Sequence, residues 1–371
     1  MTLASPMTPR QPMLQRLEAA AELLTRYQFA CWHYGDSIGF EGLLAASKLL
    51  ATPRYEAFVY GALKSWIPRA LPYSELDNTA PGHAMCLCYE RTQDPALLDA
   101  ATGLAEFLMT RQRRRGAFVS FSKAPLREPY GETQLPPEER ALLDSPGPGI
   151  FVDCLHFDAP FLVHLGALKQ EAALVEAGAE QALAMIDLLQ DTRTGLFWHF
   201  WLERTDATYG LGWGRGQGWA LLGLLDVLEQ LPPSNPAWPR LADSVVRLAQ
   251  ALRDHQHPSG HWPTLVQEPG SYLESSTALF VVTGFLRGIQ LGVLDASAQT
   301  VASRAWNAGV AVVSDDGEVT EVSAAVWAST AQGHYRAVPT GFVVPWGQGP
   351  LLTAAECVRS GYGIEKLEYA A

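Results

Sequence analysis

The stretch Phe161-Leu-Val-His-Leu-Gly-Ala-Leu168 is apolar almost all the way round a helix, and two later stretches share this property. These are Ala220-Leu-Leu-Gly-Leu-Leu225 and Ala278-Leu-Phe-Val-Val-Thr-Gly-Phe-Leu286. A helix without a polar face is buried on all sides. None of the three approaches the ~18–20 apolar residues that a membrane span needs. We therefore expect them to be inner helices of one large core.

A second kind of helix alternates with these inner helices and has one polar face. Its clearest example lies at 245–253, where polar side chains separate the apolar positions Val245, Val246, Leu248, Ala249 and Leu252. Such a pattern is typical of a helix that covers a core and faces water on its other side. Inner and outer helices in alternation indicate a double ring of helical hairpins.

Similar turns follow several of the outer helices. A glycine near an aromatic or aliphatic residue recurs at Gly116, Gly195, Gly260 and Gly317. We expect each glycine to be the left-handed cap of the preceding helix. Clean strand alternation is scarce. The sequence thus predicts an all-α fold, an α/α barrel that forms a single domain over residues 1–371, with residues 1–12 as a flexible tail.

Composition narrows the partners and the compartment. The formal charge of −12 argues against nucleic acid, whose binding relies on Lys and Arg at phosphates. It leaves room for a small anionic ligand, because charges beyond ~8–10 Å are largely screened. The five cysteines follow no zinc-like spacing, and the first dozen residues lack the apolar segment of a secretory signal. We expect a cytoplasmic protein without metal or cofactor and without membrane attachment, and a homodimer is left open.

Polar residues that interrupt the apolar pattern stand just before or at the start of inner helices: Asp77, Asp153, Arg215, Glu274 and Trp346. In a closed ring such helix starts lie at one end of the barrel. We therefore expect these side chains to converge on a central funnel, which is the default place for a ligand.

Asp153 is the first candidate for catalysis. An aspartate before a helix is often an N-cap, but Asp158, directly before Ala159-Pro160, is better placed for that role. Asp153 then remains among apolar neighbours, where burial raises the pKa of a carboxyl as a proton donor requires. Asp77 lies in a Pro/Gly loop, and a turn-stabilising role is the common alternative for such a residue.

The stretch Leu211-Gly-Trp213-Gly-Arg215-Gly-Gln217-Gly-Trp219 is the richest in candidate ligand contacts. It does not fit a phosphate loop, because no strand precedes it and no Lys-Ser/Thr follows it. A tight aromatic turn explains the glycines but not the arginine. Arg suits the bidentate binding of a carboxylate.

Three further segments carry polar or aromatic candidates. His199 lies among aromatic residues and is as easily a core histidine as a ligand. Glu274 fits an N-cap or a substrate contact equally well. Tyr34 and Trp346 lie near the two ends of the chain, which meet in a closed ring.

Together these motifs resemble glycoside hydrolase family 105, the unsaturated rhamnogalacturonyl hydrolases, and the related unsaturated glucuronyl hydrolases of family 88. The resemblance runs from about residue 32 to residue 357. It rests on the segments 77–82, 153–162, 195–199, 213–219 and 345–349. Their order and spacing are specific, although Gln217, Leu202, Phe157 and Ser276 depart from the family pattern.

The resemblance implies an (α/α)6 barrel, no cofactor, and an enzyme that removes a Δ4,5-unsaturated uronic acid from the non-reducing end of an oligosaccharide. Asp153 would be the catalytic acid/base and Asp77 the second carboxylate. The sugar subsite would comprise Tyr34, His199, Trp213, Arg215 and Trp219.

Two other functions stay open at this point. One is a sugar epimerase with histidine bases, for which His156, His199 and His261 are candidates. The other is a sugar-binding or scaffold domain without turnover. Only a hydrolase that hydrates the double bond would bleach the ultraviolet absorption of an unsaturated uronide.

Overall fold

Six helices line the inside of the structure. The computed structural model describes residues 12–31, 33–73, 79–131 and 133–360, and within them each inner helix contacts the next around a ring until the last meets the first. The inner helices are α2 (Tyr34–Leu49), α4 (Pro81–Thr92), α8 (Ala159–Lys169), α10 (Gly214–Gln230), α12 (Ser275–Gln290) and α15 (Pro345–Arg359). The three apolar stretches fall in α8, α10 and α12, which confirms their prediction as inner helices.

Six amphipathic helices surround this ring. They are α1 (Met13–Thr25), α3 (Arg54–Trp66), α5 (Pro95–Thr110), α9 (Ala172–Leu189), α11 (Trp238–Asp254) and α13 (Ala298–Ala311). In α11 the predicted apolar face is buried except for Val246, which is 44% exposed. Successive residues of a helix point about 100° apart, so Val246 faces away from the side that Val245 buries. Outer and inner helices alternate along the chain, and the predicted (α/α)6 barrel is confirmed.

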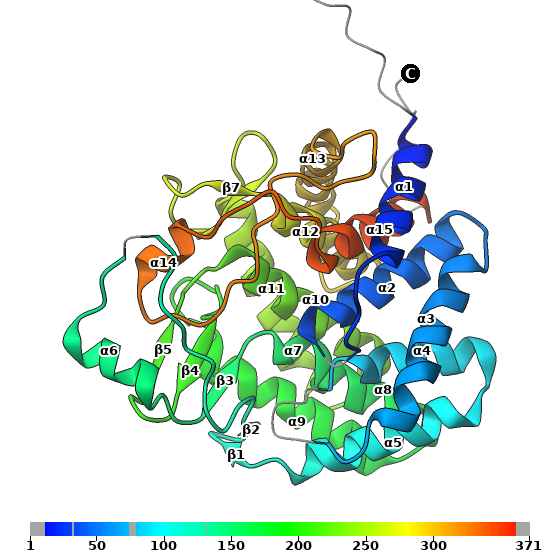
Figure 1. The fold of residues 1–371 in the computed structure, drawn as a ribbon, viewed down its shortest axis with the longest axis horizontal. Helices are drawn as coiled ribbons and strands as arrows, with labels where there is room; N and C mark the ends of the chain where they lie inside the picture. The colour runs from blue at the N-terminus through cyan, green and yellow to red at the C-terminus, as the bar shows by residue number, and fades with distance from the viewer. Residues whose placement is uncertain (1–11, 32, 74–78, 132, 361–371) are drawn as a thin grey trace, which may run out of the picture.

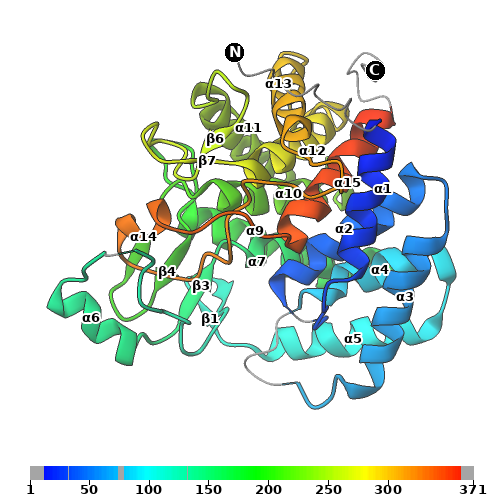
Figure 2. The same cartoon turned by 45° about the horizontal axis from the view of Figure 1, so that its top comes forward.

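The ring closes where the first and last hairpins meet. Inner helices α2 and α15 touch backbone to backbone, because a Cβ atom on Gly42 would lie only 2.5 Å from the Cα atom of Gly349. Outside them, the Arg16 guanidinium of α1 donates to the carbonyl oxygens of Val310 and Val313 at 2.6 and 2.8 Å. Both views show α1 beside α15 (Figures 1 and 2).

The four turn glycines have the expected positive φ angles, between 76° and 94°, but they are not helix caps. Each lies six residues beyond the last residue of α5, α9, α11 or α13, so the prediction of a left-handed cap was wrong. Three of them press against the backbone of the next outer helix: a Cβ atom would lie 2.7 Å from Arg247 O at Gly195, 2.4 Å from Arg304 O at Gly260, and 2.2 Å from Ala20 N at Gly317. These glycines therefore seal one hairpin against its neighbour.

We expect Gly317→Ala to destabilise the protein because it adds a backbone clash to a strained φ angle. The left-handed conformation alone costs an L-residue roughly 1–2 kcal/mol, and overpacking adds about 1–3 kcal/mol. Gly292→Ala is the matched control, since Gly292 has a φ of 70° but no atom within 4 Å of the added Cβ. Urea midpoints of both variants measure the difference, and equal shifts would show that the contact with α1 contributes nothing.

Short strands occupy the loops at one end of the barrel. They are β1 (Arg113–Arg114), β2 (Ala117–Phe118), β3 (Gly149–Phe151), β4 (Phe200–Leu202), β5 (Ala207–Tyr209), β6 (Trp262–Pro263) and β7 (Leu273–Glu274). The order of the largest sheet is β3-β4-β5, with antiparallel pairs. The short helices are α6 (Pro137–Asp144), α7 (Cys154–Phe157), α14 (Gln332–Arg336) and the 3₁₀ turn Ile67–Arg69. Two or three residues are too few to show the alternation that identifies a strand in sequence.

All five cysteines are buried and free. Among the described helices, none has the length and apolar content that crossing a membrane requires. The predicted tail falls almost wholly on residues 1–11, which lie outside the described ranges.

Candidate active site

A cavity of about 480 Å³ opens at the end of the barrel that carries the loops. This volume is in the range of sites for small organic ligands. Its described lining consists of His33, Tyr34, Ser120, Phe121, Pro125, Arg127, Phe151, Asp153, Cys154, Phe157, His199 and the segment 325–328. Of the residues predicted from sequence, Tyr34, Asp153 and His199 line it. Asp77 lies outside the described residues.

Strand pairing places Asp153 beside His199. Strand β3 pairs with β4 so that Phe151 faces Phe200, and the next backbone amide, Val152 N–H, donates to His199 O at 2.8 Å. The chain then turns into α7, which brings Asp153 Oδ2 to 3.6 Å from His199 Nε2. This distance is too long for a direct hydrogen bond. Two residues that are 46 positions apart in the chain thus share one wall of the cavity.

The carboxyl group of Asp153 keeps its proton to a higher pH than an exposed aspartate does. Burial raises the pKa of its carboxyl to about 6, although Arg215 and His156 partly oppose the shift. Its Oδ2 atom is buried and accepts no hydrogen bond from a described residue. Desolvation disfavours the charged form of such a carboxyl. The group can therefore act as an acid at a pH where an exposed aspartate cannot.

His199 is held as a neutral ring. Burial lowers its pKa well below the usual value, and the neighbouring His334 and Arg215 lower it further. Its Nδ1 atom lies 2.8 Å from the Tyr335 hydroxyl. Burial also keeps the pKa of Tyr335 well above its ordinary value, so this hydroxyl stays protonated and can donate to Nδ1. The Nε2–H of His199 then faces Asp153.

From the sequence we expected Asp158, and not Asp153, to be an N-cap. The prediction for Asp158 was wrong. Asp158 makes no N-cap hydrogen bond with α8, because α7 ends directly before it and its backbone is helical rather than extended. Its Oδ1 instead accepts a hydrogen bond from the Thr79 hydroxyl. Asp153 makes no cap bond with α7 either. Asp153 is therefore not an N-cap, as expected, but this is not because Asp158 caps α8 instead.

Arg215 is buried and committed to the protein. Only 1% of the residue is exposed, and its Nη1 atom lies 3.3 Å from Glu274 Oε1 and 2.7 Å from Ser323 Oγ. Its Nη2 atom donates to Ala324 O at 2.9 Å. Glu274 is the N-cap of α12 and accepts from Thr277 N at 3.1 Å. A carboxylate of the protein thus already pairs with the guanidinium that was expected to bind a substrate carboxylate.

Aromatic rings connect Arg215 with the cavity. The guanidinium lies over the rings of Trp213 and Trp346, at 5.2 and 5.5 Å from their centroids. Trp346 stacks on Tyr34 with a centroid distance of 5.5 Å, and Trp213 packs against His199 at 4.3 Å. Arg215, Glu274, Trp213 and Trp346 therefore form the layer behind the lining residues.

Trp219 lies deeper in the barrel. It is fully buried in the second turn of α10, where its ring packs against His156 and Phe280 at centroid distances of 5.1 and 4.9 Å. His156 is buried as well, between Glu41 at 3.3 Å and Asp226 at 3.7 Å. His261 contacts Ser259 in the turn before β6. Of the three histidines considered as bases, His199 alone lines the cavity.

Sequence reasoning missed the outer part of the cavity. Arg127 and Trp327 line it, and Tyr130 stacks on Trp327 at a centroid distance of 4.2 Å. We call Arg127, Tyr130 and Trp327 the rim. His33 also lines the cavity and caps α2 by accepting from Gly35 N at 3.2 Å. These residues lie in loops without periodicity, and aromatic enrichment was the only available signal.

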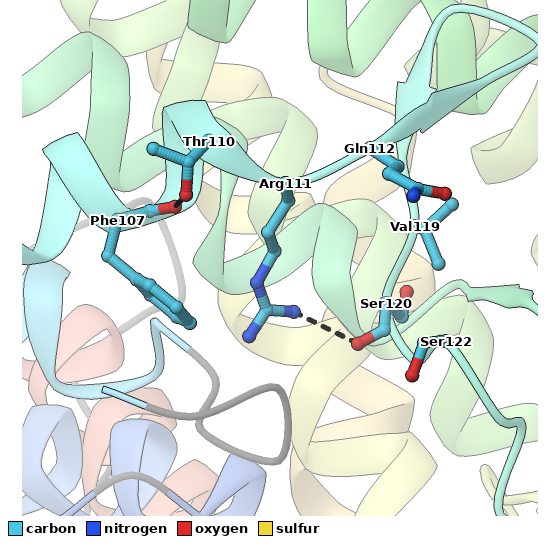
Figure 3. A pocket seen from close by; sticks show the side chains of 7 residues that line it. All are labelled: Phe107, Thr110, Arg111, Gln112, Val119, Ser120 and Ser122. Atoms are coloured by element: carbon cyan, nitrogen blue, oxygen red, sulfur yellow. Dashed lines mark hydrogen bonds between the residues drawn. The ribbon is translucent and has the colours of Figure 1, made fainter. Parts of the chain in front are cut away.

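A second pocket, of about 290 Å³, borders the segment around Ser120, which also lines the first cavity (Figure 3). Ser120 lines both cavities. In Figure 3 the Arg111 guanidinium reaches the carbonyl oxygen of Ser120, at 2.9 Å. The hydroxyl of Ser120 accepts a hydrogen bond from Phe151 N at 3.0 Å. Arg111 thus anchors the segment that holds β3, and with it the position of Asp153.

Comparisons with known proteins bear on the family and the fold. The unsaturated rhamnogalacturonyl hydrolase YesR of Bacillus subtilis is 24% identical over 327 residues, which is 87% of this chain and 88% of that protein. A possible member of family GH105 from Salmonella enterica superposes with a TM-score of 0.77 at 21% identity, covering 98% of this chain and all of the other. The unsaturated glucuronyl hydrolase of Bacillus sp. GL1 superposes with a TM-score of 0.67 at 19% identity, covering 92% and 95%.

These structural matches share the fold of this chain and confirm the barrel. The sequence model described as glycosyl hydrolase family 88 matches residues 13–360, from the first helix to the end of α15. The resemblance found in the motifs is thereby confirmed over nearly the whole chain. The protein is a glycoside hydrolase, and it belongs to glycosyl hydrolase family 88.

Proposed function

We propose that this enzyme removes a Δ4,5-unsaturated uronic acid from the non-reducing end of an oligosaccharide by hydrating the double bond. The observation that carries the proposal is the position of Asp153 in the cavity together with the raised pKa of its carboxyl group. It is the one carboxylate among the described lining residues, and burial raises its pKa to about 6. The relatives named as unsaturated rhamnogalacturonyl and glucuronyl hydrolases support the same substrate class.

In the proposed reaction Asp153 donates its proton to C4 of the unsaturated ring. Positive charge then develops at C5 and the ring oxygen. Water attacks C5 and returns a proton to Asp153, which restores the acid. The hemiketal so formed opens and releases the next sugar. One water is consumed, and no covalent bond to the protein forms.

We assign the other predicted residues to two layers. Tyr34 and His199 would contact the sugar from the cavity wall. Arg215, with Glu274, Trp213 and Trp346, would fix that wall from behind, and Trp219 would support it from below. Asp77 remains the proposed second carboxylate, which would stabilise the charge at C5.

Isotope labelling tests the proposed chemistry. In heavy-oxygen water we expect the label at C5 of the opened keto acid and none on the released sugar, with loss of the ultraviolet band. A saturated uronide is the control and should not be cleaved, because it offers no double bond to protonate. Label at the anomeric carbon, read by mass spectrometry before exchange with solvent, would mean ordinary glycosidic cleavage. Binding without any bleaching would indicate a silent sugar-binding domain.

A further inference from the structure

The rim is built from two loops that are far apart in the chain. One loop precedes α6 and the other precedes α14, and these two helices lie on the same side of the molecule in both views (Figures 1 and 2). A parallel bridge joins Leu126 to Ala328. Trp327 Nε1 donates to Glu128 O at 3.2 Å, and the Tyr130 hydroxyl donates to Ala325 O at 3.3 Å. A β-bridge and two hydrogen bonds therefore hold the two loops of the rim together.

Arg127 is the exposed cation of this wall. Its guanidinium lies over the Trp327 ring, 5.5 Å from the centroid, and it lines the cavity. Among the described residues, no carboxylate lies within ion-pair distance of it. Arg215, in contrast, is paired with Glu274 at 3.3 Å. In a chain of formal charge −12, Arg127 thus brings to the mouth of the cavity a positive charge that pairs with no carboxylate of the described residues.

Burial defines an inner and an outer end of the cavity. The side chain of Asp153 is 13% exposed, and that of His199 is 3% exposed, whereas Arg127 is an exposed residue and Trp327 is half-buried. If Asp153 protonates the terminal sugar, that sugar occupies the inner end. The rest of the bound oligosaccharide must then extend outward past the rim.

We propose that the rim is the subsite for the sugar that follows the unsaturated uronate, and that Arg127 selects an anionic substituent on that sugar. This inference rests on the proposed function. A guanidinium presents paired N–H donors that fit the oxygens of a sulfate or a carboxylate. The preferred substrate is therefore an unsaturated uronide linked to a sulfated or acidic sugar, rather than to a neutral one.

The test compares substrates that differ only in this charge. Unsaturated disaccharides with a sulfated second sugar, with a uronic acid as second sugar, and with a neutral second sugar are assayed by loss of ultraviolet absorption. We expect Arg127→Gln to lower kcat/KM for the charged substrates about tenfold, as for loss of a hydrogen bond to a charged group at an exposed site. Its kcat/KM for the neutral substrate should stay within twofold. The two charged substrates distinguish a sulfate site from a carboxylate site.

Arg240→Gln is the matched control, because Arg240 lies on outer helix α11 and pairs with Asp187 of α9. It makes the same change of charge and should not alter the preference. High salt should reduce the preference of the parent enzyme, since screening shortens the reach of an exposed charge. Equal losses on charged and neutral substrates, or no loss on either, would overturn the proposal.

Failure of the proposed function would look different from failure of this inference. If the parent enzyme bleached no unsaturated disaccharide, the function would be wrong. Tryptophan fluorescence would then still report whether the charged disaccharides bind more tightly to the parent than to Arg127→Gln. Equal affinities would overturn the rim as an anion subsite.

Discussion

Asp153→Asn should reduce turnover of an unsaturated disaccharide by about 10²–10⁴-fold, because general acid catalysis contributes that much and the amide has no proton to transfer. The substitution keeps the size of the side chain and removes a buried ionisable group whose Oδ2 has no hydrogen-bond partner among the described residues. Folding should therefore survive. The loss is measured as the rate of ultraviolet bleaching at saturating substrate.

Asp158→Asn is the control for this variant. Asp158 is also buried with its pKa raised to about 6, but it bonds to Thr79 and does not line the cavity. Its replacement should leave turnover within a few-fold of the parent. Near-normal bleaching by Asp153→Asn would remove Asp153 from the mechanism.

The pH profile of the parent enzyme gives the same assignment a second readout. The acid form of Asp153 is the active one, so kcat/KM should fall as pH rises through about 6. The residual activity of Asp153→Asn should lack this decline. A decline that persists unchanged in the variant would belong to another group.

Arg215→Met should destabilise the protein by about 3–5 kcal/mol, because removal of one partner leaves the buried Glu274 carboxylate uncompensated. Both side chains of the pair are nearly inaccessible, at 1% and 2% exposed. The double variant Arg215→Met/Glu274→Gln removes both charges and should recover part of this loss. Urea unfolding of the parent, both single variants and the double variant measures the coupling.

The exposed pair Arg240–Asp187 supplies the comparison for Arg215→Met. Its side chains are 55% and 60% exposed, so Arg240→Met should cost no more than about 1 kcal/mol. Similar losses at the two arginines would mean that Glu274 does not depend on Arg215. The structural role that we assign to the pair would then be wrong.

The barrel was predictable because its signal is local. Three of the inner helices show their burial in their own residues, as the stretch 161–168 does, and the turn glycines recur in similar local motifs. Asp153, Arg215 and Glu274 were recognised because they interrupt that pattern at helix starts. A burial signal of this kind does not say what a polar side chain contacts. Arg215 was therefore expected to bind substrate, although Glu274 pairs with it.

The rim was not predictable in the same way. The bond between Trp327 and Glu128 joins residues 199 positions apart, and no repeat or motif marks either loop. The N-cap prediction for Asp158 failed for a more local reason. Asp158 has the right residue type before Ala159-Pro160, but the preceding short helix α7 gives its backbone a helical conformation. Contacts between distant segments thus decided the rim, whereas the conformation of the residues directly before Asp158 decided the cap.

The closure of the ring has a consequence for synthesis. The hydrogen bond from Arg16 to Val313 spans 297 positions, and α2 finds its partner only when α15 has been made. At about 5–20 residues per second, roughly 15–60 s separate the emergence of these helices from the ribosome. Contacts of such long range also slow folding. During that interval the side of α2 that packs on α15 lacks its final cover, while its neighbour α4 is already available.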